Sequence, residues 1–332
     1  MQIIAAGQTD VGRERELNED SLLVDPALSL FIVCDGMGGH AAGEVASKTA
    51  ATTVQAYVKE REAQLVAIER GEQPIDVALT IIREAIETAS QTIFDFGKTD
   101  RAKKGMGTTC TALLVVGGKG VLGHVGDSRL YLVRQGKLYQ LSEDHTFLQE
   151  AIRYGMMTPQ QAKESAHSNI ITRAVGPMEK VIVDTLTFDV VTGDTLLLCS
   201  DGLHGYLGDG EELPELLGEG LPDAMAARFV ALANDRGGGD NITAVVVRAE
   251  HGDVTEKDLE VQRYTLVNAT FETLQHVDLF AECSSAEIVR VTNAFKSIDV
   301  EAEQQIIAEG EGSETLFVLL EGQVIVERGG QP

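Results

Sequence analysis

Two phrases of the same design, each an apolar run that ends in aspartate and glycine, constrain the fold of this chain most. The first reads Phe-Ile-Val-Cys-Asp-Gly at residues 31–36, and the second reads Leu-Leu-Leu-Cys-Ser-Asp-Gly at residues 196–202. Apolar and β-branched residues favour a buried strand, and the glycines permit close approach of the backbone. Each phrase therefore predicts a strand that delivers one carboxylate, Asp35 or Asp201, to its end.

Two further aspartates flank predicted strands in the same way. Asp127 ends the apolar run 121–127, and Asp240 stands just before the apolar run 242–247. Glu19 lies in the polar, charged segment 9–21, which cannot be core. Asp-Gly and Asp-Asn pairs commonly mark turns and nothing more, which is the alternative at any one position. Four repetitions at strand ends favour a shared site.

A cluster of these carboxylates must either take up protons or bind metal ions, because each negative charge raises the pKa of its neighbours. Oxygen-only ligands select hard divalent ions such as Mg²⁺ or Mn²⁺. Two such ions roughly 3.5–4 Å apart can activate a bridging water and bind an oxyanion, as hydrolytic phosphoryl transfer requires. Arg15 offers a bidentate donor for phosphate oxygens. The pattern thus predicts a dinuclear phosphate-hydrolysing centre.

Composition narrows the class of protein. The 332 residues are 43% hydrophobic and carry a formal charge of -25, which argues against nucleic acid or an anionic membrane as partner. The acidic excess favours cations or basic partners, or is a solvated surface. Neither a targeting segment nor a membrane-spanning run is evident, so we expect a cytoplasmic protein. The scattered cysteines predict no disulfides: Cys34, Cys110, Cys199 and Cys283.

The remaining periodicity indicates an α+β fold. Apolar residues at helical spacing predict helices over residues 41–59 and 75–96. Short-looped strands predict antiparallel hairpins over residues 108–127 and 130–141. Residues 147–169 interrupt this series of strands, and their pattern predicts short helices there.

These motifs resemble the PPM family of metal-dependent protein serine/threonine phosphatases, also called type 2C, in its bacterial form. The resemblance covers residues 1–248 and rests on these blocks: Thr9-Asp10-x-Gly12-x-x-Arg15-x-x-Asn18-Glu19-Asp20, Cys34-Asp35-Gly36-Met37-Gly38-Gly39-His40, Gly107-Thr108-Thr109, Gly126-Asp127-Ser128-Arg129, Asp144-His145-Thr146, Ile171-Thr172-Arg173-Ala174-Val175-Gly176, Ser200-Asp201-Gly202 and Gly239-Asp240-Asn241.

The resemblance implies two central, mostly antiparallel sheets flanked by helices, an α-β-β-α sandwich with the metal centre between the sheets. It also implies the metal ligands: Asp35 bridges two ions, Asp201 and Asp240 bind one, and Glu19 with the Gly36 carbonyl binds the other. Asp127, with Asp201, accommodates a weaker third ion.

Substrate handling follows from the same resemblance. Arg15 holds the phosphate, and residues 147–169 form the flap that tunes substrate access. Met37 stands where animal members carry a histidine proposed as general acid. His40 is the substitute candidate, with a plain helix-start residue as its alternative, whereas His145 and His204 are expected to be structural. The implied partners are phosphoproteins, including a cognate serine/threonine kinase and its substrates.

The composition changes beyond residue 248. Residues 249–263 read as a charged linker, and residues 264–332 resemble the opening of a cyclic-nucleotide-binding domain, with short helices followed by strands around glycine turns. This part is expected to be a partial β-rich unit. The sequence ends at Pro332 before the cassette that grips the cyclic phosphate in that family. A truncated sensor, a degenerate remnant and a protein-interaction surface all remain open.

Three functions from different classes follow. The first is a phosphatase that hydrolyses phosphoserine and phosphothreonine by attack of a metal-bridged hydroxide. The second is a catalytically weak metal-binding adaptor of the same fold, which the intact ligand positions disfavour. The third is a cyclic-nucleotide-responsive regulator, which the missing cassette disfavours.

Overall fold

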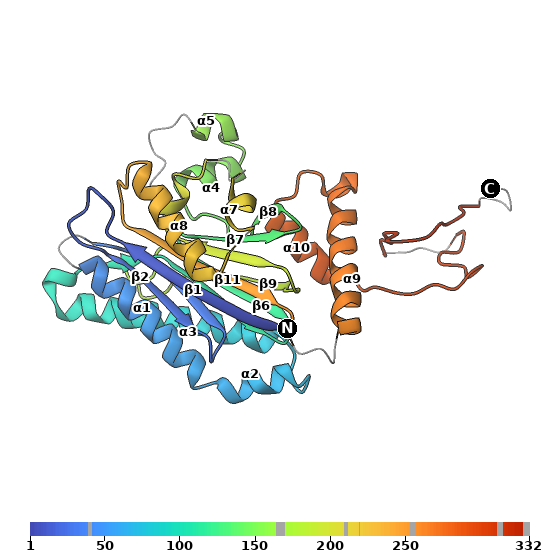
Figure 1. Cartoon of the computed structure of the whole chain (residues 1–332), viewed down its shortest axis with the longest axis horizontal. Coiled ribbons are helices and arrows are strands. Elements are labelled where there is room, and N and C mark those ends of the chain that lie inside the picture. Colours follow the sequence, from blue (N-terminus) through green and yellow to red (C-terminus); the bar gives the residue numbers. More distant parts are fainter. Residues whose placement is uncertain are drawn as a thin grey trace.

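The computed structural model of the chain describes residues 1–38, 42–163, 170–208, 212–218, 220–252, 257–310 and 315–327. Its centre is a pair of antiparallel β-sheets packed face to face, and helices cover the outer face of each sheet (Figure 1). This arrangement confirms the α-β-β-α sandwich of an α+β protein.

Each sheet is built from antiparallel pairings. Sheet A has the strand order β1 (Gln2–Asp10), β11 (Ile242–Glu250), β10 (Thr195–Cys199), β7 (Arg129–Arg134) and β8 (Lys137–Gln140). Sheet B has the order β2 (Asp20–Asp25), β3 (Leu30–Met37), β5 (Cys110–Val116), β6 (Lys119–Val125) and β9 (Asp184–Asp189), and β4 (Gly107–Thr108) pairs with the end of β3. The two predicted hairpins are therefore present as β5–β6 and β7–β8.

Helices on the two outer faces complete the layers. Sheet B is covered by α1 (Ala42–Lys59) and α3 (Asp76–Thr99), as predicted, with the short α2 (Glu62–Glu69) between them. Sheet A is covered by α6 (Asp201–His204), α7 (Leu213–Leu216) and α8 (Pro222–Asp235). The excursion after β8 carries α4 (Phe147–Arg153) and α5 (Pro159–Lys163). None of the helices within the described ranges is long and apolar enough to cross a membrane.

The continuous apolar runs have a simple structural reason. Side chains of a strand alternate between its two faces, and both faces of β3 and β10 are buried. In β3, Phe31 and Val33 point between the sheets while Ile32 points toward α1 and α3. In β10, Leu198 joins the core between the sheets and Leu197 packs under α8. Both strands thus exclude water on two sides.

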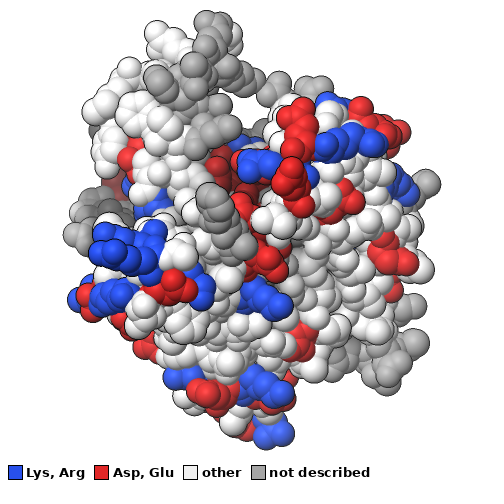
Figure 2. Space-filling view, turned by 90° about the vertical axis from the view of Figure 1, so that its left-hand side faces the viewer, with Lys and Arg blue, Asp and Glu red and all other residues white. Residues whose placement is uncertain are grey.

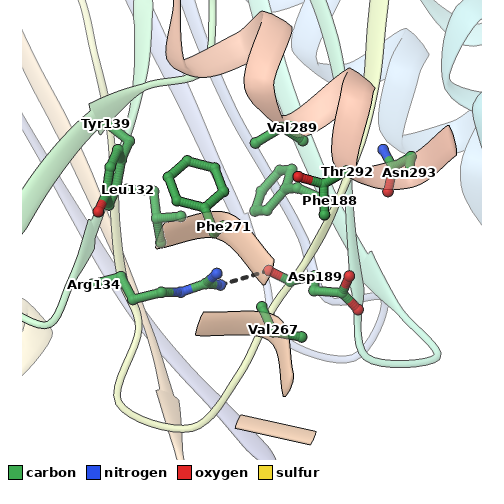
Figure 3. A pocket seen from close by; sticks show the side chains of 10 residues that line it. All are labelled: Leu132, Arg134, Tyr139, Phe188, Asp189, Val267, Phe271, Val289, Thr292 and Asn293. Atoms are coloured by element: carbon green, nitrogen blue, oxygen red, sulfur yellow. Dashed lines mark hydrogen bonds between the residues drawn. The ribbon is translucent and has the colours of Figure 1, made fainter. Parts of the chain in front are cut away.

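A pair of C-terminal helices packs on the side of the sandwich where the edge strands β8 and β9 lie. These helices are α9 (Lys257–Gln275) and α10 (Ser285–Ala294), joined through the 3₁₀ turn η3 (Asp278–Phe280). Phe271 of α9 and Val289 of α10 enter the core between the sheets, where Phe271 meets the Tyr139 ring edge-on at 4.8 Å between centroids. Figure 3 shows the pocket that these side chains line with Leu132 and Phe188.

Within residues 249–263, the predicted linker, β11 runs to Glu250 and α9 begins at Lys257. The C-terminal part differs from the sequence-based expectation in its strands. The strands predicted around residues 305–324 are wrong for the described residues there: residues 296–310 and 315–327 contain neither helix nor strand. An apolar run forms a strand only when another strand pairs with it, and these residues have no such neighbour in the described chain.

Candidate active site

The predicted acidic residues lie at one end of the sandwich. Asp35 continues the alternation of Phe31 and Val33, so its carboxylate points between the sheets. Asp201 directly follows β10, and Asp240 directly precedes β11, whose pairing with β10 brings the two residues to the same end of sheet A. Asp127 lies in the turn that joins β6 to β7, the crossing from sheet B to sheet A.

The carboxylates are close enough to change one another's protonation. Burial, followed by the charges of Asp20, Asp201 and Asp127, raises the pKa of Asp35 well above its ordinary value. Burial and the charge of Asp240 raise the pKa of Asp201. Burial and the charge of Asp201 raise the pKa of Asp127 to about 7. Carboxylates raise one another's pKa in this way when they lie close together, so these three aspartates share one site.

Two threonines fix the strand end that carries Asp35. The Asp35 amide donates to Thr109 Oγ1 at 2.8 Å, and its carbonyl accepts from the Thr109 amide and from Thr108 Oγ1, each at 2.8 Å. Thr109 Oγ1 also lies 2.7 Å from Ser128 Oγ. The β3 end is thereby connected to the turn that carries Asp127.

Glycine is required beside Glu19. A Cβ atom on Gly36 would lie 2.2 Å from the Gly43 carbonyl oxygen and 2.5 Å from the Glu19 carbonyl oxygen, and one on Gly43 would lie 2.5 Å from Glu19 Oε1. In this close packing Glu19 Oε1 accepts from the Gly43 amide at 3.2 Å, near the start of α1. The backbone of Gly36 and the carboxylate of Glu19 are therefore neighbours, as the predicted ligand pair requires.

Arg15 reaches the acidic cluster from the loop after β1. Its Nη2 donates to Asp240 Oδ2 at 2.7 Å, while the side chains of Arg15 and Asp240 remain 50% and 37% exposed. A guanidinium at the edge of the cluster, still open to solvent, can meet an incoming anion. Figure 2 shows the end of the molecule that lies on the left in Figure 1, where acidic and basic side chains lie next to one another near the middle of the face.

Sequence reasoning missed Asp20 as a member of the site. Its buried Oδ2 accepts from Ser200 Oγ at 2.8 Å and from Thr243 Oγ1 at 2.6 Å, and burial raises the pKa of Asp20 to about 7. Asp20 pairs with Asp35 across β2 and β3. It therefore joins sheet B to the end of sheet A directly behind Asp35 and Asp201.

Asn241 belongs to the Gly239-Asp240-Asn241 block, and the structure gives it a specific task. Its Oδ1 accepts from the Glu19 amide at 2.8 Å, and its Nδ2 donates to the carbonyls of Val11 and Leu17, each at 2.9 Å. One amide side chain thus holds both ends of the loop that carries Arg15. The Asp-Asn pair at this position was the available signal.

The donor set fits a hard divalent cation. Asp127 Oδ1 and Asp201 Oδ1 are buried without a hydrogen-bond partner among the described residues, which is costly for a carboxylate unless something else satisfies it. In the described parts of the chain, no three acidic, histidine or cysteine side chains are spaced to hold one ion by themselves. An ion here would take its remaining ligands from the Gly36 carbonyl or from water, as Mg²⁺ and Ca²⁺ commonly do.

Comparison with known proteins agrees with this geometry. The family model described as protein phosphatase 2C matches residues 9–236. The serine/threonine phosphatase stp of Listeria monocytogenes is 37% identical over 253 residues, which are 75% of this chain and 96% of that protein. The chain belongs to the protein phosphatase 2C family. It is a metal-dependent protein serine/threonine phosphatase.

Other phosphatases resemble the chain to a similar degree. PhpP of Streptococcus pneumoniae is 33% identical over 74% of this chain and 97% of its own length. The crystal structure of PstP/Ppp from Mycobacterium tuberculosis superposes with a TM-score of 0.67, at 35% identity, over 76% of this chain and 100% of that one. A catalytic domain of PstP solved with two manganese ions is 33% identical, with a TM-score of 0.64, over 75% of this chain and 99% of that one.

These matches leave about a quarter of the phosphatase uncovered. The resemblance of residues 264–332 to a cyclic-nucleotide-binding domain therefore stays a prediction, and so do the predicted domain limits.

The flap predicted for residues 147–169 is anchored at both ends in this phosphatase. The Phe147 amide donates to the Ile170 carbonyl at 2.9 Å, and the Thr172 amide donates to the His145 carbonyl at 2.8 Å. Asp184 then links the two ends by pairing with His145 Nε2 at 3.1 Å and Arg173 Nη1 at 2.7 Å. Residues 164–169 lie outside the described residues.

The sequence predicted roles for three histidines, and the structure describes two of them. His40, the candidate general acid, lies outside the described residues. His145 is buried, and its Nδ1 accepts from the Gly126 amide at 3.0 Å. His204 Nε2 donates to the Asp127 carbonyl at 2.9 Å, and burial lowers the pKa of His204 to about 3. His145 and His204 therefore hold the backbone of the turn that carries Asp127.

Proposed function

We propose that Asp35, Asp201 and Asp240, together with Glu19 and the Gly36 carbonyl, hold two divalent ions, Mn²⁺ or Mg²⁺, at the end of the sandwich. The observation that supports this most is the convergence of buried strand-end carboxylates that raise one another's pKa and leave buried oxygen atoms unpartnered. When bound, such ions lower the pKa of water and neutralise phosphoryl oxygens. Asp127 is proposed as a ligand of a weaker third ion.

Each protein group then has a defined task in hydrolysis of a phosphoserine or phosphothreonine ester. Arg15 binds two phosphate oxygens and orients the phosphorus for attack, because its guanidinium has the bidentate geometry for a phosphate and is half exposed beside Asp240. Thr108 and Thr109 keep Asp35 in place. We propose His40 as the proton donor to the leaving serine or threonine oxygen.

The catalytically weak adaptor remains the competing function. It needs the acidic cluster but has no use for an arginine that reaches over the cluster and stays accessible. The position of Arg15 therefore favours catalysis. The proposed substrates are phosphoproteins, including a cognate serine/threonine kinase and its targets.

The test of the proposed centre is hydrolysis of a phosphothreonine peptide and of an aryl phosphate at defined concentrations of Mn²⁺ and Mg²⁺. We expect reversible loss of both activities on chelation, and loss of activity and of metal binding in Asp35→Asn. Asp235→Asn is the matched control, because Asp235 is an exposed aspartate that pairs with Arg13 at 3.6 Å and with no other described residue. Full turnover in excess chelator would rule out the dinuclear centre.

A further inference from the structure

The basic residues of this acidic phosphatase are unevenly distributed. Four of its 27 lysines and arginines fall within residues 98–104, and no separate stretch of seven residues has more than two. This local excess stands against a net charge of -25 for the whole chain. The four residues are called the basic corner: Lys98, Arg101, Lys103 and Lys104.

The basic corner borders the loop that follows Asp35. It occupies the end of α3 and the 3₁₀ turn η1 (Arg101–Lys103), and the chain then enters β4. β4 pairs directly with Gly36 and Met37 of β3. A Cβ atom on Gly38 would lie 3.2 Å from the Met106 Cα, so the backbone just after the basic corner touches the backbone just after Asp35.

Two of the four basic side chains form ion pairs with nearby aspartates, and the other two form none with the described residues. Lys98 pairs with Asp95, and Lys103 pairs with Asp100, each at 3.3 Å. Arg101 and Lys104 are exposed, and neither makes an ion pair with another described residue. Two cations therefore face solvent next to the segment that follows Asp35, at the end of the sandwich where the acidic side chains converge.

We propose that Arg101 and Lys104 bind acidic side chains that flank the phosphorylated residue of the substrate, so that this site selects phosphoproteins with an acidic context. The proposal rests on the phosphatase function proposed above. An extended peptide spans up to about 3.3–3.6 Å per residue, so a few residues reach from the centre to its margin. Opposite charge would also steer such a substrate past the otherwise repelling acidic surface.

The experiment compares two phosphothreonine peptides of equal length, one with aspartates on both sides of the phosphothreonine and one with asparagines at the same positions. The full chain and the double variant Arg101→Gln/Lys104→Gln are assayed with both peptides and with p-nitrophenyl phosphate. The control is Lys59→Gln/Arg83→Gln, which removes the same charge from exposed positions about 24–26 Å along α1 and α3 from the helix ends at Ala42 and Thr99.

We expect the Arg101/Lys104 variant to raise KM for the aspartate peptide about three- to tenfold, because exposed ion pairs contribute little each. Its kcat, and its kinetics with the asparagine peptide and with p-nitrophenyl phosphate, should stay within about twofold of the parent. The difference between the peptides should shrink at high ionic strength.

Three outcomes would overturn the proposal: equal losses with both peptides, no loss with either, or the same selective loss in the control variant. Failure of the parent enzyme to hydrolyse any phosphopeptide would instead contradict the phosphatase function itself.

Discussion

At the scale of single residues, Arg15 distinguishes a catalyst from a metal-binding scaffold. Lysine keeps the charge but not the bidentate geometry, so Arg15→Lys should be impaired and Arg15→Ala more so. A charge-assisted hydrogen bond of about 1.5–3 kcal/mol corresponds to roughly a ten- to hundredfold loss in kcat/KM. Steady-state kinetics with a phosphothreonine peptide, at saturating Mn²⁺, measures this loss.

Arg13→Ala is the control for Arg15, because Arg13 lies in the same loop but contacts the Asn234 carbonyl and Asp235 instead. It should change kcat/KM by no more than about twofold. Since Arg15 also touches Asp240, a Mn²⁺ titration of each variant is needed. Parent-like kinetics in Arg15→Ala would contradict the phosphate-binding role, and a loss confined to metal affinity would assign Arg15 to support of Asp240.

We expect His124 to make the stability of the phosphatase sensitive to acid. It is buried, its Nε2 donates to the Glu143 carbonyl at 3.0 Å, and its Nδ1 is left to accept from Thr111 Oγ1 at 2.9 Å. Burial and the neighbouring charge of His145 lower the pKa of His124 to about 4, although Asp144 and Asp184 oppose this shift. The unfolded chain binds this proton near pH 6.5. Between these values the unfolded state holds more protons, so stability falls as pH falls from about 6.5 to 4.

The His124→Gln variant isolates this contribution, because glutamine can keep both hydrogen bonds and does not titrate. Each unit of depressed pKa corresponds to about 1.4 kcal/mol, so the parent should lose roughly 3 kcal/mol more than the variant on acidification from pH 7 to pH 4. Urea unfolding at intervals of half a pH unit measures both slopes. Identical slopes would show that His124 is not the group responsible.

At the scale of elements, the sequence predicts what is local and misses what depends on packing. β3 and β10 are recognisable because burial on both faces makes them continuously apolar. The contacts of Asp20 are not recognisable, since Ser200 and Thr243 lie 180 and 223 residues away in sequence. The strands expected around residue 316 fail for a related reason: an apolar run does not specify the strand that would pair with it.

The α9–α10 pair belongs energetically to the sandwich. Phe271 is 5% exposed, packs on Tyr139 and fills the space between the sheets at their β8–β9 edge (Figure 3). Phe271→Ala should therefore lower the free energy of unfolding by about 3–5 kcal/mol. Val261→Ala on the same helix should cost less than about 1 kcal/mol, since Val261 is 56% exposed. Urea unfolding monitored by circular dichroism compares them, and equal effects would mean that α9 does not complete the core.

At the scale of the whole molecule, we expect the acidic centre to lower the stability of the folded chain when no metal ion is bound. Buried carboxylates that disfavour one another's charge destabilise the folded chain, and a ligand that binds only the folded state offsets this loss. At a concentration one hundred times its dissociation constant, a single ion contributes about 2.7 kcal/mol. For a chain of 332 residues, that corresponds to an increase in Tm of roughly 4 °C.

Calorimetric melting in chelator and in Mn²⁺ tests this linkage without any assay of activity. The parent should melt at a higher temperature in Mn²⁺ than in chelator. Asp35→Asn removes a buried charge from the centre together with a proposed ligand, so it should melt in chelator no lower than the parent and respond little to Mn²⁺. The Asp235→Asn variant changes an exposed side chain, so its melting temperature should respond to Mn²⁺ as that of the parent does. An undiminished Mn²⁺ response in Asp35→Asn would place the stabilising ion elsewhere and contradict the proposed centre.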